Sequence, residues 1–574
     1  MDNRDYARVL KEIAALMQIK GGNQFRIRAF ENAARTIETQ TESLEAIIDR
    51  GELTDLSGIG KGIARELQQM RQQGSCDLHR ELLAELDPGL LTLMKIQGLG
   101  PKRIKAIYDE LGIADPESLR QAAETHQIQQ LSGFGKKTEE KIVSELDRLA
   151  RNQGRIPLPR AQSIAGSLRD QLRELDSVDS IEIAGSLRRG RETIGDIDLL
   201  VATEDSEPVH QAFRSLVEVE EVLLSGDTKT SVRLHNGIQV DLRTVEPEIF
   251  GSALHYFTGS KEHHVALRTR AKRQGLKISE YGVFGEDEST PLASRSEQQL
   301  FDCLGLDYIP PELREGTDEI ERAANARLPR LVEPGDIRGD LHMHTTETDG
   351  RATIEEMAHT AIERGYEFIA ITDHSQAVRV ANGMNAQRLG EQIKAIRRID
   401  DACDELQILA GIEVDILKDG SLDMDHQLLA ECDWVVASVH SHFGLSAEAM
   451  TERLVRAIES GLVCALGHPT GRILGGRDGY SYDFQTVFDC AAKHDVALEI
   501  NGSTGRLDLN AELAAYAHQR GARLVIGSDA HSCRGLDDIH FGIQQARRAG
   551  LEAESILNCL SADRLLKTLK ETRT

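Results

Sequence analysis

Two aspartates one residue apart, at the start of an apolar run in AGSLRRGRETIGDIDLLV, constrain this chain more than any other stretch. Asp196 and Asp198 should share one face of a buried strand, because side chains two apart on a strand point the same way. Two unpaired carboxylates at one place repel each other and raise each other's pKa, and a divalent cation removes that cost. Asp241, in the apolar segment QVDLRTV, would complete a two-metal site.

A glycine-serine turn precedes these acids. Gly185 and Ser186 offer backbone N–H groups and a hydroxyl, and nearby Arg189 offers a guanidinium, where a triphosphate could lie. We therefore expect nucleotidyl transfer. The alternative is a solvated pair of aspartates at a strand end, because a DxD pattern alone is a weak signal.

The order GS, RR, GDID and a later VDL resembles the palm of the family X DNA polymerases, the family of polymerase beta, and HYFTGSKEHH at 255–264 resembles that family's YFTGS turn. His264 stands where many relatives carry asparagine. The resemblance implies that Asp196, Asp198 and Asp241 are catalytic and hold two Mg2+ ions. It also implies that an incoming dNTP is bound through its phosphates by Gly185, Ser186, Arg189 and Gly195, and through its sugar and base by Tyr256, Phe257 and Gly259.

A second pattern occurs three times in the N-terminal third, which otherwise has apolar residues at helical spacing. Each copy is an apolar residue, GxG, a lysine within two residues, and a helix. Glycine permits a tight turn, and a helix N-terminus offers N–H groups to an anion. These copies resemble helix-hairpin-helix motifs, which grip the DNA backbone; the alternative is a turn between helices with a capping glycine. The implied DNA contacts are Gly58, Gly60 and Lys61, then Gly98, Gly100 and Lys102, then Gly133, Gly135 and Lys136.

The C-terminal half places a metal-ligating residue type at the end of almost every apolar strand. His342 and His344, two apart on an expected strand, face one way. Amphipathic helices, such as those expected over 391–406 and 447–460, separate the strands. Functional groups gathered at the ends of parallel strands are typical of a β/α barrel.

These segments resemble the PHP (polymerase and histidinol phosphatase) domain, a distorted seven-stranded barrel with a trinuclear site. Imidazole and carboxylate ligands together suit Mn2+, Zn2+ or Fe2+ better than Mg2+. We expect Asp373, His442 and Glu499 to orient the ligands. The ligand pattern of the PHP domain falls on His342, His344, Asp349, His374, Glu413, His440, His468, Asp529 and His531.

The order of these parts resembles the bacterial PolX family, and the resemblance covers essentially the whole chain. The expected fold is multidomain, of α+β and α/β class, with a palm helix over 161–175. The expected domains are 1–85, a helical DNA-end-binding domain; 86–154, fingers with two further hairpins; 155–250, the nucleotidyltransferase palm; 251–316, the thumb; 317–336, a linker; and 337–574, the PHP domain.

The resemblance implies a polymerase that fills short gaps in base excision repair, with a 3'-5' exonuclease, and in relatives an abasic-site endonuclease, in the second domain. The expected partners are gapped or primed double-stranded DNA and dNTPs, with no membrane, and a monomer is expected. A net charge of -26 argues against nonspecific coating of nucleic acid, so DNA affinity must come from local basic patches. The N-terminus has no secretory pattern and the cysteines have no close spacing, so we expect a cytoplasmic, nucleoid-associated protein without disulfides.

Two other functions fit part of this pattern. A small-molecule nucleotidyltransferase fused to a phosphoesterase would use the same palm, but the glycine hairpins and the YFTGS segment argue against it. A non-enzymatic scaffold for DNA ends would not need Asp196, Asp198, Asp241 and the full set of PHP ligands.

The first glycine hairpin predicts a missing activity. In polymerase beta and its lyase-active relatives, a lysine six residues beyond the second glycine forms a Schiff base with 5'-deoxyribose phosphate. That position is Glu66 here, and a carboxylate cannot form an imine. Borohydride reduction on a 5'-deoxyribose-phosphate substrate should therefore trap no adduct within residues 1–85. An adduct that disappears in Lys61→Ala would show that Lys61 had taken over the role.

Overall fold

The structure is a computed structural model that describes residues 3–38, 40, 43–87, 89–94, 96, 98–152, 154–285 and 290–572. The chain divides into two compact units, residues 1–153 and residues 154–574. Within the described ranges, no helix is both long and apolar enough to cross a membrane.

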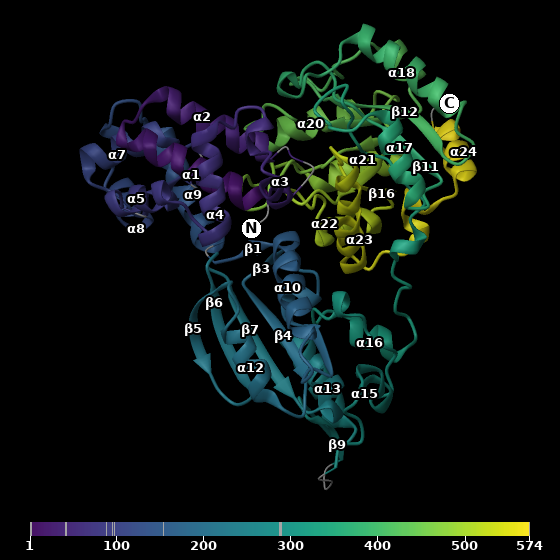
Figure 1. The fold of residues 1–574 in the computed structure, drawn as a ribbon. Helices are drawn as coiled ribbons and strands as arrows, with labels where there is room; N and C mark the ends of the chain where they lie inside the picture. The colour runs from purple at the N-terminus through teal and green to yellow at the C-terminus, as the bar shows by residue number, and fades with distance from the viewer. Residues whose placement is uncertain are drawn as a thin grey trace. The chain divides into compact units, whose positions relative to one another are not determined.

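The described residues of the N-terminal unit form helices and turns (Figure 1). One core packs around Leu10, Phe30 and Leu67, and a second around Ile104 and Leu119. Each core is built from the apolar faces of short amphipathic helices, as the helical spacing predicts. The helices are α1 Asn3–Lys20, α2 Gln24–Glu38, α3 Leu44–Arg50, α4 Lys61–Gln73, α5 Asp77–Glu85, α6 Gly89–Leu93, α7 Pro101–Leu111, α8 Pro116–Glu124 and α9 Lys136–Asn152.

Each glycine hairpin forms the predicted turn. The first glycines, Gly58, Gly98 and Gly133, have φ of +81°, +94° and +83°, a region that favours glycine. The following helices α4, α7 and α9 begin directly after the second glycine. A Cβ atom on the second glycines would meet no atom of the described residues within 4 Å, so packing within that part of the chain does not require glycine at Gly60, Gly100 and Gly135.

In the C-terminal unit, residues 155–245 form a five-stranded sheet in the order β2-β4-β7-β6-β5. Helices α10 and α12 pack against it (Figure 1). Strands β4 and β7 are its only parallel pair among the described residues. The elements are β1 Ile156–Pro157, α10 Leu158–Arg173, β2 Ser180–Ile183, α11 Gly185–Arg188, β3 Thr193–Ile194, β4 Asp196–Ala202, α12 Ser206–Arg214, β5 Val219–Ser225, β6 Lys229–Leu234 and β7 Gln239–Val245.

Residues 250–328 form a smaller layer with its own core around Leu267 and Phe301. The segment 317–336, expected as a linker, packs on both neighbours: Ala323 belongs to this core and Val332 to the barrel core. The elements are α13 Phe250–Thr258, α14 Lys261–Arg273, β8 Leu276–Ser279, β9 Gly282–Gly285, α15 Glu297–Cys303 and α16 Glu319–Ala324.

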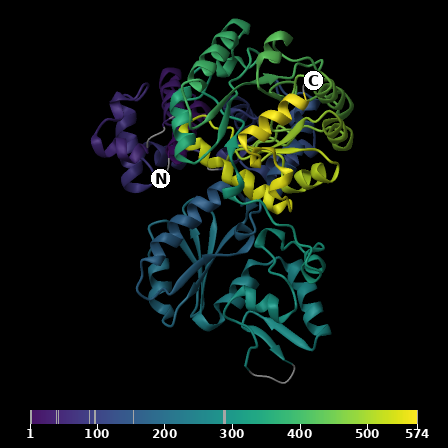
Figure 2. The same ribbon diagram turned by 90° about the vertical axis from the view of Figure 1, so that its right-hand side faces the viewer.

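The rest of the unit is the predicted seven-stranded barrel. Its strands β10 to β16 pair in parallel and in chain order, and a further bridge between Met343 and Ala530 links the two ends. Helices lie outside the strands (Figure 2). The strands are β10 Gly339–Asp340, β11 Phe368–Ile371, β12 Gln407–Asp415, β13 Trp434–Ser438, β14 Ala465–Leu466, β15 Ala497–Asn501 and β16 Leu524–Gly527. The helices are α17 Ile354–Glu363, α18 Ala386–Asp400, α19 His426–Glu431, α20 Ala447–Ile458, α21 Phe484–Lys493, α22 Ala511–Gln519, α23 Ile539–Arg548 and α24 Ala562–Thr572.

For two helices, the range predicted from the sequence lies a few residues C-terminal of the range in the structure. Helix α18 begins at Ala386 rather than 391, because the Asn385 side chain caps it by accepting from the Arg388 N–H at 3.0 Å. It ends at Asp400, whose carboxylate accepts from the N–H of Ile408 at 2.7 Å. Ile408 is the second residue of the next strand, β12. Helix α10 begins at Leu158, with proline in its first turn.

The palm and the barrel share a hydrophobic core. Leu507 and Phe541, which follow β15 and open α23, pack into the cluster that holds Leu168, Ile197 and Val240 of the palm. Leu507 is fully buried there. The two layers should therefore unfold together.

Trp434 can test this cooperativity, because it is the only tryptophan of the chain and lies fully buried in the barrel strand β13. Leu168→Ala, in the palm, should destabilise the unit by about 2–4 kcal/mol and shift the urea midpoint followed by Trp434 fluorescence. The matched control is Leu67→Ala, an equally buried leucine of the N-terminal unit, which should leave that midpoint in place. An unchanged Trp434 transition in Leu168→Ala would contradict a shared core.

Candidate active sites

The three predicted palm acids lie together. The register of β4 and β7 places Asp198 beside Asp241, and Asp196 lies two residues before Asp198 on the same face. Burial, followed by the charges of Asp196 and Asp241, raises the pKa of Asp198 to about 7. The geometry thus concentrates negative charge that a bound divalent cation would neutralise.

Asp241 has a different environment from Asp198. Lys229 Nζ lies 2.6 Å from its Oδ2, and Gln239 Nε2 donates to its Oδ1 at 2.9 Å. Although burial acts in the opposite direction, these contacts lower the pKa of Asp241. Asp241 is therefore held ionised and oriented. The sequence did not single out Lys229 or Gln239 for this role.

The glycine-serine turn touches the acids directly. Gly185 has φ of +64°, and a Cβ atom there would lie 2.1 Å from Asp198 Oδ2, so no side chain fits. A Cβ atom on Gly195 would lie 3.2 Å from Arg155 Nη1. Arg189 Nη1 donates to the Thr258 carbonyl, and its Nε lies 3.3 Å from Glu315 Oε1. The turn, Ser186 included, thus lies beside the acids, and its arginine is engaged with the next layer.

The YFTGS segment forms the end of α13 and lies against this turn. A Cβ atom on Gly259 would lie 2.9 Å from Arg189 Nη1. Arg243 lies over the ring of Phe257, 4.5 Å from its centroid. His264 stacks on Tyr256, with 5.3 Å between ring centroids, and its Nε2 donates to the Tyr256 carbonyl at 2.8 Å. His264 therefore fixes the tyrosine within the protein.

Arg188, next to the predicted phosphate ligand, joins the palm to the following layer. Its guanidinium forms two hydrogen bonds with Glu297, at 2.9 and 2.7 Å. Although burial opposes ionisation, Arg314 and Arg188 hold the pKa of Glu297 at about 2. The two adjacent arginines thus differ in role. Arg188 has a structural contact with Glu297, and Arg189 is the predicted phosphate ligand.

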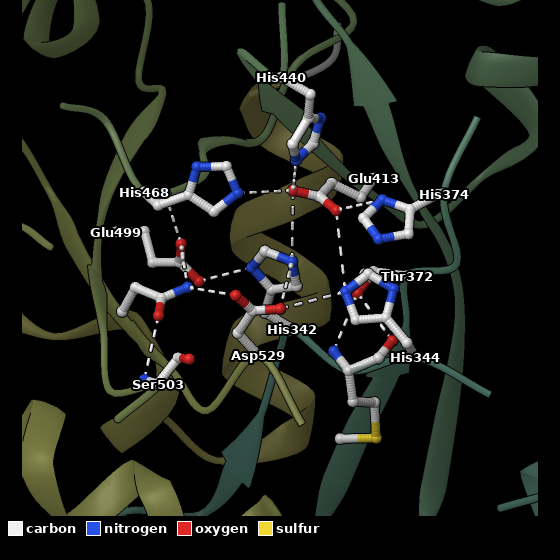
Figure 3. A network of polar contacts seen from close by, with 12 residues as sticks. His342, His344, Thr372, His374, Glu413, His440, His468, Glu499, Ser503 and Asp529 are labelled. Carbon is white, nitrogen blue, oxygen red and sulfur yellow. Dashed lines mark hydrogen bonds and ion pairs between the residues drawn. The ribbon is translucent and has the colours of Figure 1, made fainter. Parts of the chain in front are cut away.

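The barrel gathers the predicted PHP ligands at the carboxyl ends of its strands. Figure 3 shows those that lie around Glu413. Three overlapping groups have ligand atoms within 4.8 Å of one another. His344 belongs to two of these groups and His374 to two, so the groups are continuous. His468 lies outside them, but its Nε2 is 2.9 Å from Glu413 Oε1. The groups are His344, Asp349, His374 and His531; His342, His344 and Asp529; and His374, Glu413 and His440.

The donor set fits transition metal ions. His342 Nε2 and His344 Nε2 are buried and have no hydrogen-bond partner in the structure, a state that is costly unless a metal ion binds these atoms. Asp529 and His468 adopt positive φ, +54° and +29°, which is uncommon outside glycine and frequent at functional sites.

Charges alternate across this centre. Burial opposes the charged form of Glu413, but His440, His374 and His342 bring its pKa well below its ordinary value. In turn Glu413 and Asp415 raise the pKa of His440 to about 9, against the effect of burial. The ligands thus pair with one another as acids and imidazoles.

Further carboxylates orient the imidazoles. Glu499 Oε1 lies 2.6 Å from His342 Nδ1, as expected, so the Nε2 atom is left for a metal ion. Asp415 Oδ1 lies 3.1 Å from His440 Nδ1 in the same way. The sequence analysis missed Asp415, although it stands two residues after Glu413 and shares its face of β12. The sequence signal for Asp415 was a second carboxylate two residues after a predicted ligand on the same expected strand.

The other two expected orienting residues lie elsewhere. Asp373 accepts from the Thr345 N–H at 2.8 Å and from its hydroxyl at 2.6 Å, so it fixes the loop after His344 rather than a ligand ring. His442 is exposed, and none of its described hydrogen bonds reaches the centre.

The hairpin lysines form a third kind of site. Lys61, Lys102 and Lys136 are exposed at the first turns of their helices. Beside each, the second glycine leaves open space where a Cβ atom would be. An extended anion could approach the backbone closely at these turns.

Comparison with known proteins identifies the family. A relative from Bacillus subtilis, the "DNA polymerase/3'-5' exonuclease PolX", is 40% identical over 98% of this chain and 98% of its own length. The chain belongs to the PolX family. A "Probable phosphatase" of Photobacterium profundum is 32% identical over 38% of this chain and 88% of its own length, and one of Caldanaerobacter subterraneus is 29% identical over 41% and 91%.

Family models agree with PolX membership along the chain. The matches are a helix-hairpin-helix domain over residues 1–76, a SAM-like helix-hairpin-helix tandem over 90–148, a DNA polymerase beta palm over 155–234, a DNA polymerase beta thumb over 253–315 and a PHP domain over 340–503. The family and the multidomain fold predicted from the sequence are thereby confirmed.

The raised pKa of Asp198 predicts a cost that Asp198→Asn would remove. The folded chain holds a proton at Asp198 up to about pH 7, whereas an unfolded aspartate releases it near pH 4. Without metal, the wild type should therefore lose stability between about pH 4 and pH 7, and Asp198→Asn should gain roughly 2 kcal/mol over it above pH 7.

Denaturant unfolding in EDTA at pH 4.5, 6 and 8 measures this gain. The matched control is Asp176→Asn, an exposed acid of the same palm, whose effect should not change with pH. A gain for Asp198→Asn that is largest at pH 4.5 would show that the wild-type carboxylate is not destabilised by its neighbours.

Proposed function

We propose that this PolX-family DNA polymerase and 3'-5' exonuclease fills short gaps in DNA during base excision repair, with polymerisation in the palm and degradation in the PHP barrel. The observation that carries the polymerase site is the pairing of Asp198 with Asp241 under the Gly185 turn. The proposal includes a cytoplasmic monomer that joins the nucleoid when it binds DNA.

In the palm, Asp196, Asp198 and Asp241 would hold two Mg2+ ions, which suit an all-carboxylate site. Bound there, the ions would supply charge neutralisation for the primer 3'-OH and the triphosphate. Gly185, Ser186, Arg189 and Gly195 would bind the phosphates. Tyr256, Phe257 and Gly259 would form the wall against the sugar and base.

In the barrel, the nine predicted residues would hold three ions of Mn2+, Zn2+ or Fe2+, because imidazole ligands favour these over Mg2+. Such ions, when bound, would activate water and polarise a phosphodiester. Glu499 and Asp415 would keep the imidazoles in the binding orientation. An abasic-site endonuclease would use the same centre.

The helical unit would hold gapped or primed duplex DNA by its backbone. The three hairpins offer N–H groups and lysines with no side chain at the second glycine, a geometry that suits phosphate. The open space at Gly60, Gly100 and Gly135 supports this role, because no contact among the residues that the structure describes requires glycine there. The domain boundary predicted between residues 154 and 155 would separate the DNA-binding helical unit from the catalytic palm and barrel.

The alternatives fit less well. A PolX relative aligned over 98% of the chain argues against a small-molecule nucleotidyltransferase, and two acidic or imidazole-rich centres argue against a scaffold without activity.

Separate ligand sets predict separable activities. Asp196→Ala with Asp198→Ala should abolish primer extension on gapped DNA and spare 3'-5' degradation, and His342→Ala with His344→Ala should do the reverse. Degradation should be strongest with Mn2+ and weak with Mg2+. Gel assays of the full-length variants measure both activities, and metal analysis should find transition metal lost only from the histidine variant.

A folded double variant that lost both activities would contradict two independent centres. Equal metal retention by the two variants would contradict the assignment of transition metal to the barrel.

A further inference from the structure

Side chains of the barrel donate hydrogen bonds to the turn that follows α11, which is the proposed nucleotide-binding turn. Arg548 Nη1 donates to the Arg189 carbonyl at 2.6 Å, and Gln545 Nε2 donates to the Gly190 carbonyl at 3.2 Å. Both donors lie on α23. Carbonyls at the end of a short helix such as α11 lack internal partners and favour donors and positive charge. Side chains of the barrel satisfy them here.

The contact leaves no space at the turn. Gly190 has φ of +69°, and a Cβ atom there would lie 2.8 Å from Gln544 Cγ. Gln544 Oε1 in turn accepts from Gln162 Nε2, on α10, at 2.9 Å. Gln545 is fully buried. The α23 helix therefore packs directly on the turn, and a shift of one would move the other.

Glu315 links Arg548 to the predicted phosphate ligand. Its Oε1 lies 3.0 Å from Arg548 Nη1 and 3.3 Å from Arg189 Nε, and its Oε2 lies 3.3 Å from Arg191 Nη1. The side chain of Arg548 is 9% exposed and that of Arg189 13%, so solvent screens these charges only in part. Without Arg548, the ion pairs of Glu315 with described residues would be those with Arg189 and Arg191.

We propose that Arg548 and Gln545 are positioning residues for dNTP binding: they fix the carbonyl end of the turn, and Arg548 offsets Glu315 so that Arg189 can turn to the triphosphate. This inference rests on the proposed function of the palm. It makes the barrel part of the polymerase site without a contact to the substrate.

Single-nucleotide incorporation on gapped DNA tests the inference in the full-length chain. Arg548→Ala should raise the KM for dNTP about tenfold, with a smaller change in kcat, because a buried charge-assisted contact is lost. Arg548→Lys should recover part of the loss, since it restores the charge. Exonuclease activity of the same preparation should not change, because no predicted barrel ligand is altered.

A matched control and a suppressor separate this mechanism from damage to the barrel. Arg520→Ala removes another ion-paired arginine of the barrel, one that pairs with Asp489 and makes no described contact with the palm, and it should leave the KM unchanged. Glu315→Gln added to Arg548→Ala should bring the KM back toward the wild-type value, because Arg189 is then released.

An unchanged KM in Arg548→Ala, a parallel loss of exonuclease activity, or no recovery in the double variant would each overturn the inference. If the wild type extended no primer, the proposed function would fail instead. Equal affinities of the wild type and Arg548→Ala for Mg-dNTP in calorimetry would still overturn the coupling in that case.

Discussion

The burial of ionisable groups in a confined space governs both candidate centres. In the palm, burial and then the neighbouring charges of Asp196 and Asp241 raise the pKa of Asp198 to about 7. In the barrel, buried imidazoles and carboxylates pair with one another and leave His342 Nε2 and His344 Nε2 without hydrogen bonds. Keeping these groups together lowers the folding stability of each domain, and bound cations would raise it again.

The two centres manage this cost with different supports. Lys229 holds Asp241 ionised, and the positive charge of Lys229 offsets part of the repulsion that Asp241 exerts on its neighbours. The barrel instead uses carboxylates behind the histidines, Glu499 and Asp415, which fix each ring. The carboxylate oxygens of the palm are hard ligands that suit Mg2+, whereas the oriented imidazoles of the barrel suit softer ions. The chemistry proposed for each half follows from this difference.

The sequence predicted the parts of the fold that repeat a short pattern. Asp196 and Asp198 are two apart on β4, so local spacing alone sets their common face. His342 and His344 were expected on a strand, but they follow the end of β10 at Asp340, on either side of the bridging residue Met343. The sequence could not reveal Lys229, which reaches Asp241 from the neighbouring strand β6, or Asn385, whose capping bond moved the start of α18. It also gave no sign of Arg548, because a contact 359 residues away depends on how the barrel packs on the palm.

The packing of α23 on the palm ties the two parts to one polypeptide. Separation would expose Leu507 and Phe541 on the barrel and the apolar surface that they cover on the palm. It would also leave the Arg189 and Gly190 carbonyls without their donors. Gene fission at the segment before β10 would thus expose apolar surface on both products, and a polymerase that evolved independence from its barrel would first have to rebuild the back of its nucleotide turn.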